Sequence, residues 1–277
     1  MTARAADATP TLTLEPVTSR INAFQQWWVL TERGLLKVLR NGEFIFAFVS
    51  PVFLAVCFYL PLRKVVAEVT AIDYAQYLMP IIMLQSMAFV ASSSAMRSAL
   101  DGQAGVHARF RVLPMSEAIP FLARSATNAV LLVVALACGL VTCLVMGWRP
   151  ESAEVGGGIA GAAIAVALVG MIGMALSLVS DGIGLVAKSP AATSQLVAFP
   201  TLILGMLSTG FMPVDRFPEW IQGFVENQPI SQITRAMRDA IGGVLDWQSL
   251  AAAVWWTLGL LVLAAVLVAI GSRKDAQ

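Results

Sequence analysis

Six uncharged apolar stretches divide this chain, and they constrain its fold more than any other feature. They cover residues 44–62, 74–96, 125–148, 155–180, 189–214 and 247–272, and each holds 19 to 26 residues. A helix needs about 20 residues to cross the hydrocarbon core of a bilayer. Only 13% of the residues are charged, against about 25% in soluble domains, which leaves too little polar surface to cover a soluble fold. We therefore predict an all-α integral membrane protein with six transmembrane helices.

The motifs that the chain lacks exclude several kinds of chemistry. It has no GxxxxGK[ST] phosphate loop and no HExxH metal motif, and its single histidine, His107, cannot form a metal site alone. Its three cysteines lie in apolar stretches, without the spacing of a zinc site or a disulfide framework. The six stretches contain no Asp, Glu, Lys or Arg, the residues that ion-coupled transporters use at depth. We expect no catalytic residue, metal or cofactor in this chain.

The first 42 residues divide into a tail and an amphipathic helix. Residues 1–19 show no periodicity, as in a flexible tail. In residues 20–42, Phe24, Trp28 and Leu39 recur at helical spacing, with basic residues on the opposite side. This pattern is typical of a helix that lies in the headgroup plane, although a helix packed on a soluble domain can share it. We predict an interfacial helix.

The distribution of Lys and Arg orients the chain in the membrane. With the N-terminus inside, the inner segments hold 12 of the 18 basic residues and the outer segments hold six. Cytoplasmic loops of membrane proteins carry an excess of Lys and Arg. We therefore expect both termini in the cytoplasm, with a flexible tail at 1–19 and a second cytoplasmic tail at 273–277.

The outer segment before the last apolar stretch is too polar to span a membrane, yet it has helical periodicity. Apolar residues around Trp220 form one face, and a second apolar face follows Pro229 and ends at Gly242 and Gly243. We predict two short amphipathic helices that form an outer-leaflet hairpin at 213–243. An ordinary folded loop is the alternative.

One long polar stretch, residues 97–124, interrupts the apolar pattern in the first half of the chain. Its charged residues include Arg97, Asp101, Arg109 and Arg111, and the orientation above places it in the cytoplasm. We predict that it is a docking element for a soluble partner that supplies energy. A solvated loop whose charges only set the topology is the alternative.

Two motifs in this chain resemble those of a known family, the type-2 ATP-binding-cassette exporter permeases. In the coupling segment of that family an acidic residue, a glycine, a basic residue and a hydrophobic-Pro pair precede the third helix. Here these are Asp101, Gly105, Arg109 and Leu113 with Pro114, although the family more often has Glu at the first position. The outer stretch, with its FPEWI and NQPI sequences, is similar to the daunorubicin-resistance branch from actinobacteria.

The resemblance implies a type-2 transmembrane domain over residues 20–272 and several partners. Two separate ATPase subunits would bind ATP and Mg and would dock on segment 97–116. A second permease, identical or a sister subunit, would complete the transporter in the bacterial plasma (inner) membrane, and no nucleic acid takes part. The candidate ATPase-coupling residues are Asp101, Gly105, Arg109, Phe110, Arg111, Leu113 and Pro114. Those of the outer hairpin are Trp220, Asn227, Gln228 and Pro229.

The implied function is that of a permease subunit in an ATP-driven exporter. Its cargo would be hydrophobic or amphipathic, such as a lipid, glycolipid or drug, because the transmembrane stretches hold no charge. The path would lie between two permeases, along the first, second and fifth transmembrane helices. Candidate path residues are Phe48, Phe53, Gln85, Phe89 and Ser208. For Gln85, a hydrogen bond between helices is the alternative role.

Two other function classes compete with this interpretation. A membrane assembly or scaffold protein would need no ATPase partner. An intramembrane enzyme, for instance a lipid transferase, would need an acid, base or nucleophile constellation, and the sequence shows none.

Overall fold

The computed structural model describes residues 22–69, 74–106, 109, 115–116, 118–150, 157–187, 189–244 and 246–274, without the side chains of 62, 65–69 and 272–274. Every regular element in these ranges is a helix, so the all-α prediction is confirmed for them. The tail predicted at 1–19 lies outside the described residues, as do the last three residues of the tail at 273–277.

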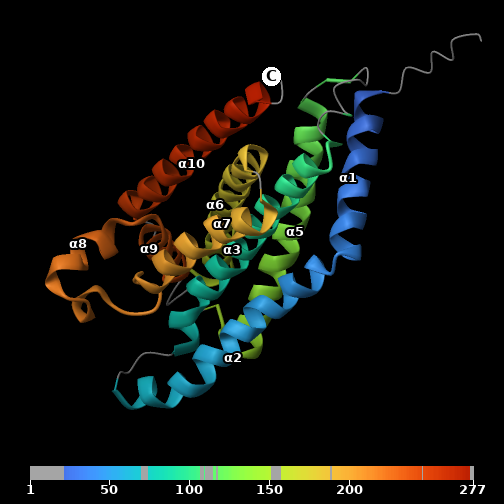
Figure 1. Cartoon of the computed structure of the whole chain (residues 1–277). Helices are drawn as coiled ribbons and strands as arrows, with labels where there is room; N and C mark the ends of the chain where they lie inside the picture. The colour runs from blue at the N-terminus through green and yellow to red at the C-terminus, as the bar shows by residue number, and fades with distance from the viewer. Residues whose placement is uncertain are drawn as a thin grey trace, which may run out of the picture.

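The described helices follow one another along the chain. They are α1 (Ala23–Arg40), α2 (Glu43–Val69), α3 (Tyr74–Gln103), α5 (Ala118–Val145), α6 (Gly158–Val186), α7 (Pro190–Met206), η1 (Val214–Arg216), α8 (Glu219–Asn227), α9 (Pro229–Ile241) and α10 (Trp247–Lys274). The start of α1 and the end of α10 lie at the same end of the molecule, and α8 lies towards the opposite end (Figure 1). The chain therefore returns to the end from which its described part begins.

The count of six transmembrane helices is not confirmed. Five helices are long and apolar enough to cross a bilayer, namely α2, α3, α5, α6 and α10. The apolar stretch 189–214 contains a helix of only 17 residues, α7, which is about 25 Å long at 1.5 Å per residue. It stops at Met206 because a turn follows, in which the Ser208 hydroxyl donates to the Gly205 carbonyl oxygen at 2.5 Å. The uncharged stretch 189–214 therefore extends beyond Met206, where α7 ends.

Helix α3 forms the centre of the bundle and packs against α2, α5, α6 and α7. Of its most apolar stretch 78% is buried, against 17% in α2 and in α10. Small residues let α6 approach α3 closely: a Cβ added to Gly184 would lie 2.5 Å from the Cβ of Ser98 and 2.6 Å from the carbonyl oxygen of Ala95. Close approach through small residues is typical of helix packing in membranes.

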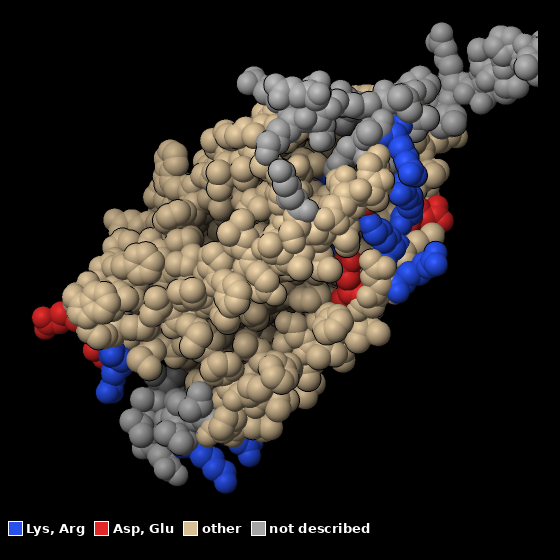
Figure 2. Space-filling view, viewed as in Figure 1, with Lys and Arg blue, Asp and Glu red and all other residues tan. Residues whose placement is uncertain are grey.

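The outward faces of α2, α7 and α10 are apolar. Large exposed side chains on them include Phe53, Phe199 and Trp255, which are 67%, 57% and 72% exposed. On the face drawn in Figure 2, the described charged side chains gather towards the two ends, and the surface between them is uncharged. Soluble monomers rarely expose a contiguous apolar surface of this extent, whereas a lipid bilayer solvates one. The chain is a multi-pass membrane protein.

Helix α1 lies within the stretch predicted as an interfacial helix. It packs against α5 and buries Thr31 and Val38. The aromatic and aliphatic residues of the predicted apolar face, Phe24, Trp28 and Leu39, are 55% to 64% exposed. The helix therefore turns one apolar face away from the bundle.

The segment 213–243 holds η1, α8 and α9 and is attached to the bundle by a partly buried arginine. Arg238 of α9 donates to the carbonyl oxygens of Thr209 at 2.8 Å and of Tyr77 and Gly210 at 3.2 Å, and its guanidinium lies 4.0 Å from the centre of the Tyr77 ring. Burial lowers the pKa of Arg238, and Tyr77 offsets part of that shift. These contacts fix α9 to the first turn of α3.

The four residues singled out in this segment have different environments. Trp220 is 83% exposed on α8, and the Asn227 amide donates to the Gly223 carbonyl at 2.8 Å at the end of that helix. Gln228 is buried, and its amide donates to the Leu207 carbonyl in the turn after α7. Pro229 begins α9, where the lack of an N–H costs no helical hydrogen bond.

Candidate functional site

A cavity of about 610 Å³ lies between α2, α3 and α7. Phe46 of α2 and Phe89 of α3 contribute a stacked aromatic pair with ring centres 6.4 Å apart. Leu202 lines it from α7, and because Phe46 and Leu202 are 62% and 46% exposed, the cavity opens at the surface of the bundle. Its size falls in the range of small-molecule sites, about 300 to 1,000 Å³.

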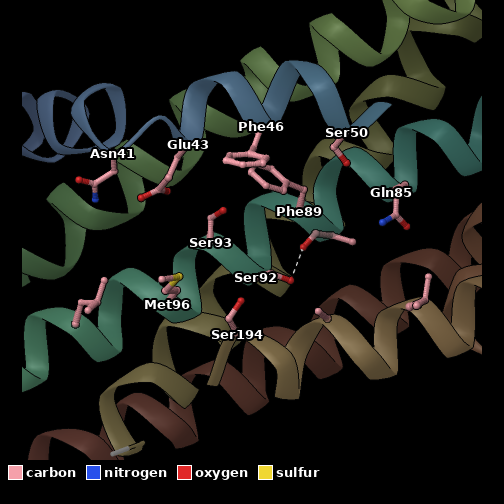
Figure 3. Close-up of a pocket in the computed structure, with 14 residues that line it drawn as sticks. Asn41, Glu43, Phe46, Ser50, Gln85, Phe89, Ser92, Ser93, Met96 and Ser194 are labelled. Carbon is pink, nitrogen blue, oxygen red and sulfur yellow. Dashed lines mark hydrogen bonds between the residues drawn. The ribbon is translucent and has the colours of Figure 1, made fainter. Parts of the chain in front are cut away.

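Polar side chains converge on the same cavity from three helices (Figure 3). Serine hydroxyls come from Ser50, Ser92, Ser93 and Ser194, and the Ser92 hydroxyl donates to the Ala88 carbonyl at 3.0 Å. The Gln85 amide makes no hydrogen bond to any described residue. The cavity therefore combines aromatic surface with donors and acceptors that a ligand can use.

Two of the five candidate path residues line this cavity, and three lie elsewhere. Gln85 and Phe89 are part of the lining, and the alternative role of Gln85, a bond between helices, finds no partner among the described residues. Phe48 and Phe53 of α2 lie outside the lining and are 53% and 67% exposed. The aromatic residue of α2 that lines the cavity is Phe46. Ser208 is buried in the turn after α7, where its oxygen also accepts the Gly210 N–H at 3.1 Å.

A buried polar network lies beside one end of the cavity and joins four helices. Arg97 of α3 donates to a carboxylate oxygen of Glu43 of α2, and at 2.6 Å to the amide oxygen of Asn128 of α5. Asn128 in turn donates to Asp181 Oδ2 of α6 at 3.0 Å, and the Ser94 hydroxyl donates to Asp181 Oδ1 at 2.6 Å. Asp181 and Asn128 are each 2% exposed. The network therefore ties α2, α3, α5 and α6 together through side chains.

The sequence interpretation missed this network because it placed two of its members in loops. Asp181 was expected in the connection between two transmembrane helices, but α6 continues through it to Val186. Arg97 was expected in the polar stretch, but α3 continues to Gln103. The spacing of Ser94, Arg97 and Asp101 by three and four residues is the signal that could have revealed a continuing polar helix face.

The described part of the coupling segment begins as helix. Asp101 lies in the last turn of α3, and its carboxylate accepts a bond from Lys37 Nζ at 2.7 Å, which links α3 to α1. Gly105 follows with φ +63°, a conformation that favours glycine. Arg109 is exposed, and its N–H donates to the Gly105 carbonyl at 3.2 Å. Phe110, Arg111, Leu113 and Pro114 lie outside the described residues.

A metal centre is not among the arrangements that the structure offers. Within the described ranges, no group of three His, Cys, Asp or Glu side chains gathers at ligand distance. The polar network contains two carboxylates, but Arg97 and Asn128 fill the space between them.

Comparisons with known proteins agree on one family for this chain. Residues 25–241 match the ABC-2 type transporter family. The chain is 32% identical to the doxorubicin resistance ABC transporter permease protein DrrB of Mycobacterium tuberculosis, over 96% of each chain. It is 29% identical to the probable doxorubicin resistance permease DrrC of that organism, over 61% of this chain and 59% of the relative. The daunorubicin resistance permease DrrB1 of Streptomyces coeruleorubidus is 27% identical, over 69% and 62%.

Proposed function

Because this chain belongs to the ABC-2 type transporter family, we propose that it is the permease subunit of an ATP-driven exporter of hydrophobic or amphipathic molecules. The relatives carry doxorubicin and daunorubicin resistance in their names, which makes planar amphipathic drugs the first cargo to test. Lipids and glycolipids are cargo of the same physical class. Export runs from the cytoplasmic side outward.

The cavity between α2, α3 and α7 is the observation that carries this proposal. It offers a stacked aromatic pair, several hydroxyls and the free amide of Gln85 in one space of about 610 Å³. Small-molecule sites combine an apolar lining with a few convergent polar groups. The cavity opens beside the exposed faces of α2 and α7, so a second permease, identical or a sister subunit, would close it from outside.

Helix α3 connects the cavity to the coupling segment. Phe89 and Asp101 lie on this one helix, about 18 Å apart along its axis at 1.5 Å per residue. Two ATPase subunits, which bind ATP and Mg, would dock on segment 97–116. Their closure would move the end of α3 and thereby the wall of the cavity. A continuous, buried helix transmits such a displacement with little loss.

Both termini lie on the cytoplasmic side of the bacterial plasma membrane in this proposal. The start of α1 and the end of α10 lie at the same end of the molecule (Figure 1), as an even number of crossings requires. Helix α7 would be the sixth crossing, short enough to end within the membrane. The exposed face of α1 with Phe24 and Trp28 would rest in the inner headgroup layer, and α8 and α9 would lie in the outer leaflet.

The experiment is ATP-dependent accumulation of doxorubicin in inside-out membrane vesicles that contain the permease and its ATPase partner. We expect accumulation that needs both subunits and stops when the phosphate-loop lysine of the ATPase is replaced. Vesicles in which doxorubicin and a fluorescent phospholipid both fail to move under ATP would contradict the proposal.

Docking is tested separately by copurification of the ATPase. We expect Asp101→Lys and Phe110→Ala to reduce the recovered ATPase. Lys37→Ala is the matched control, because it removes the intramolecular partner of Asp101 and changes no residue of segment 97–116. Recovery of full ATPase with both segment variants would contradict docking at this segment.

A further inference from the structure

Glu43 brings a negative charge to one end of the cavity. Among the described residues that line the cavity, it is the single charged one. It is the first residue of α2, where the helix dipole stabilises a carboxylate. Its side chain is 17% exposed, and Figure 3 shows it at the end of the cavity next to Asn41. The cavity is therefore not chemically uniform along its length.

The described hydrogen bonds of the polar network join more carboxylates than cations. Its hydrogen bonds join two acids, Glu43 and Asp181, to one guanidinium, that of Arg97. Asp181 is bonded to neutral donors, the Ser94 hydroxyl and the Asn128 amide. A buried carboxylate without a cation is costly, so this network favours an additional positive charge close to it.

The geometry of Glu43 leaves one acceptor for that charge. Arg97 occupies Oε2, and Oε1 makes no hydrogen bond to a described residue. Phe46 lies three residues further along α2, so it shares a helix face with Glu43 and stacks on Phe89. An acceptor at the end of an aromatic surface is complementary to a molecule that has a flat apolar body and a cationic group.

We propose that Glu43 makes this cavity select lipophilic cations over neutral molecules of the same shape. A protonated amine of the cargo donates to the Glu43 carboxylate, while its ring system lies against Phe46 and Phe89. The inference rests on the proposed function, in which this cavity binds the cargo. It adds a preferred class of cargo, planar ring systems that carry a basic aliphatic amine, and it names Glu43 as the residue that recognises the charge.

The test compares two probes that differ in charge at one nitrogen. Doxorubicin has an amine that is protonated at neutral pH, and N-acetyldoxorubicin carries the same ring system with a neutral amide. ATP-dependent transport of both is measured in vesicles that contain the permease and its ATPase partner. We expect the unmodified protein to transport the amine with an apparent affinity about tenfold higher, the effect of one charge-assisted hydrogen bond.

Glu43→Gln should abolish this preference by lowering the affinity for the amine about tenfold and leaving that for the amide unchanged. Glutamine still offers Arg97 an oxygen, so the network keeps its hydrogen bond. Glu32→Gln is the matched control, since Glu32 is an exposed carboxylate on α1 away from the cavity. We expect it to keep the tenfold preference.

The outcomes separate this inference from the proposed function. Transport of both probes with equal affinity by the unmodified protein overturns the role of Glu43 and leaves the exporter proposal intact. A preference that persists in Glu43→Gln does the same. Absence of ATP-dependent transport for both probes and for a fluorescent phospholipid overturns the proposed function itself. If Glu43→Gln does not accumulate in the membrane, the two probes are compared on the unmodified protein only, and equal apparent affinities there overturn the inference.

Discussion

Two arginines, Arg97 and Arg238, hold opposite ends of α3 in different ways. At one end Arg97 bonds to side chains, the carboxylate of Glu43 and the amide of Asn128. At the other end Arg238 bonds to the main-chain carbonyls of Tyr77, Thr209 and Gly210 and lies over the Tyr77 ring. Main-chain carbonyls keep their positions unless the backbone moves, whereas side-chain partners change with a rotamer. The first end can therefore rearrange, and the second is a fixed anchor.

This difference matches what an ATP-driven permease needs from the two ends. Arg97 and Asp101 both lie on α3 within segment 97–116, the proposed coupling segment. The end at Arg238 ties α9 to the bundle, so in the proposed transport cycle movement of segment 97–116 would turn α3 against a stationary point. A hinge needs both a mobile and a fixed end. Substitutions at the Arg238 end should therefore mainly lower stability, whereas substitutions at the Arg97 end should also reduce coupling.

The largest effect is expected at the fixed end. Arg238→Ala removes three hydrogen bonds to main-chain carbonyls, and at about 1 kcal/mol each the free energy of unfolding should fall by about 3 kcal/mol. Unfolding in mixed detergent micelles, followed by circular dichroism, measures this change. Arg235→Ala on the same helix is the control, because its pair with Glu226 at 3.6 Å is exposed and contributes at most about 1 kcal/mol. Equal losses for both variants would contradict the anchor.

A smaller loss of stability, with a larger loss of coupling, is expected in the network. Asn128→Ala removes the bridge between Arg97 and Asp181 and should lower the free energy of unfolding by about 2 kcal/mol. Because α5 then loses its hydrogen bonds to Arg97 of α3 and Asp181 of α6, cargo should stimulate the ATPase of the complex less. Asn227→Ala, at an exposed amide, is the control for both measurements. Full cargo stimulation in Asn128→Ala would show that the network has no part in coupling.

The smallest effect is expected for the pair between α1 and α3. Lys37 and Asp101 are 35% and 22% exposed, so water screens much of their attraction. A double-mutant cycle with Lys37→Ala and Asp101→Ala should give a coupling of about 0.5 kcal/mol in the free energy of unfolding. A coupling energy as large as the effect of Asn128→Ala would show that α1, and not the polar network, makes the main connection at the Arg97 end of α3.

Hydrophobic patterning predicted the positions of the long helices well where charges flank an apolar stretch. The last stretch, 247–272, corresponds to α10 (Trp247–Lys274), because Asp246 and Arg273 bound it in the sequence. The same rule failed at 189–214, where a serine and glycine turn ends α7 at Met206 without any charge. Hydropathy records the environment of a residue, and both a helix and a buried turn can lie in an apolar environment.

The candidate site was harder to predict, because it depends on which helix faces meet. Gln85 and Phe89 were selected from one helix, but Phe46 and Ser194 join them only through the packing of α2 and α7 on α3. Asp181 was taken for a loop residue because a charge usually ends a transmembrane helix. The hydrogen bonds from Ser94 and Asn128 that allow it inside α6 come from residues 87 and 53 positions away in the sequence.

The central claim is that cargo binds in the cavity between α2, α3 and α7, and the apparent affinity for transported doxorubicin in Phe89→Ala tests it most directly. Phe89 contributes half of the aromatic pair, so its loss should weaken apparent affinity about fivefold, as expected for an aromatic contact. Phe199→Ala is the control, because Phe199 is 57% exposed on α7 outside the lining and should leave the affinity unchanged. Unchanged affinity in Phe89→Ala, or an equal loss in both variants, would contradict the claim.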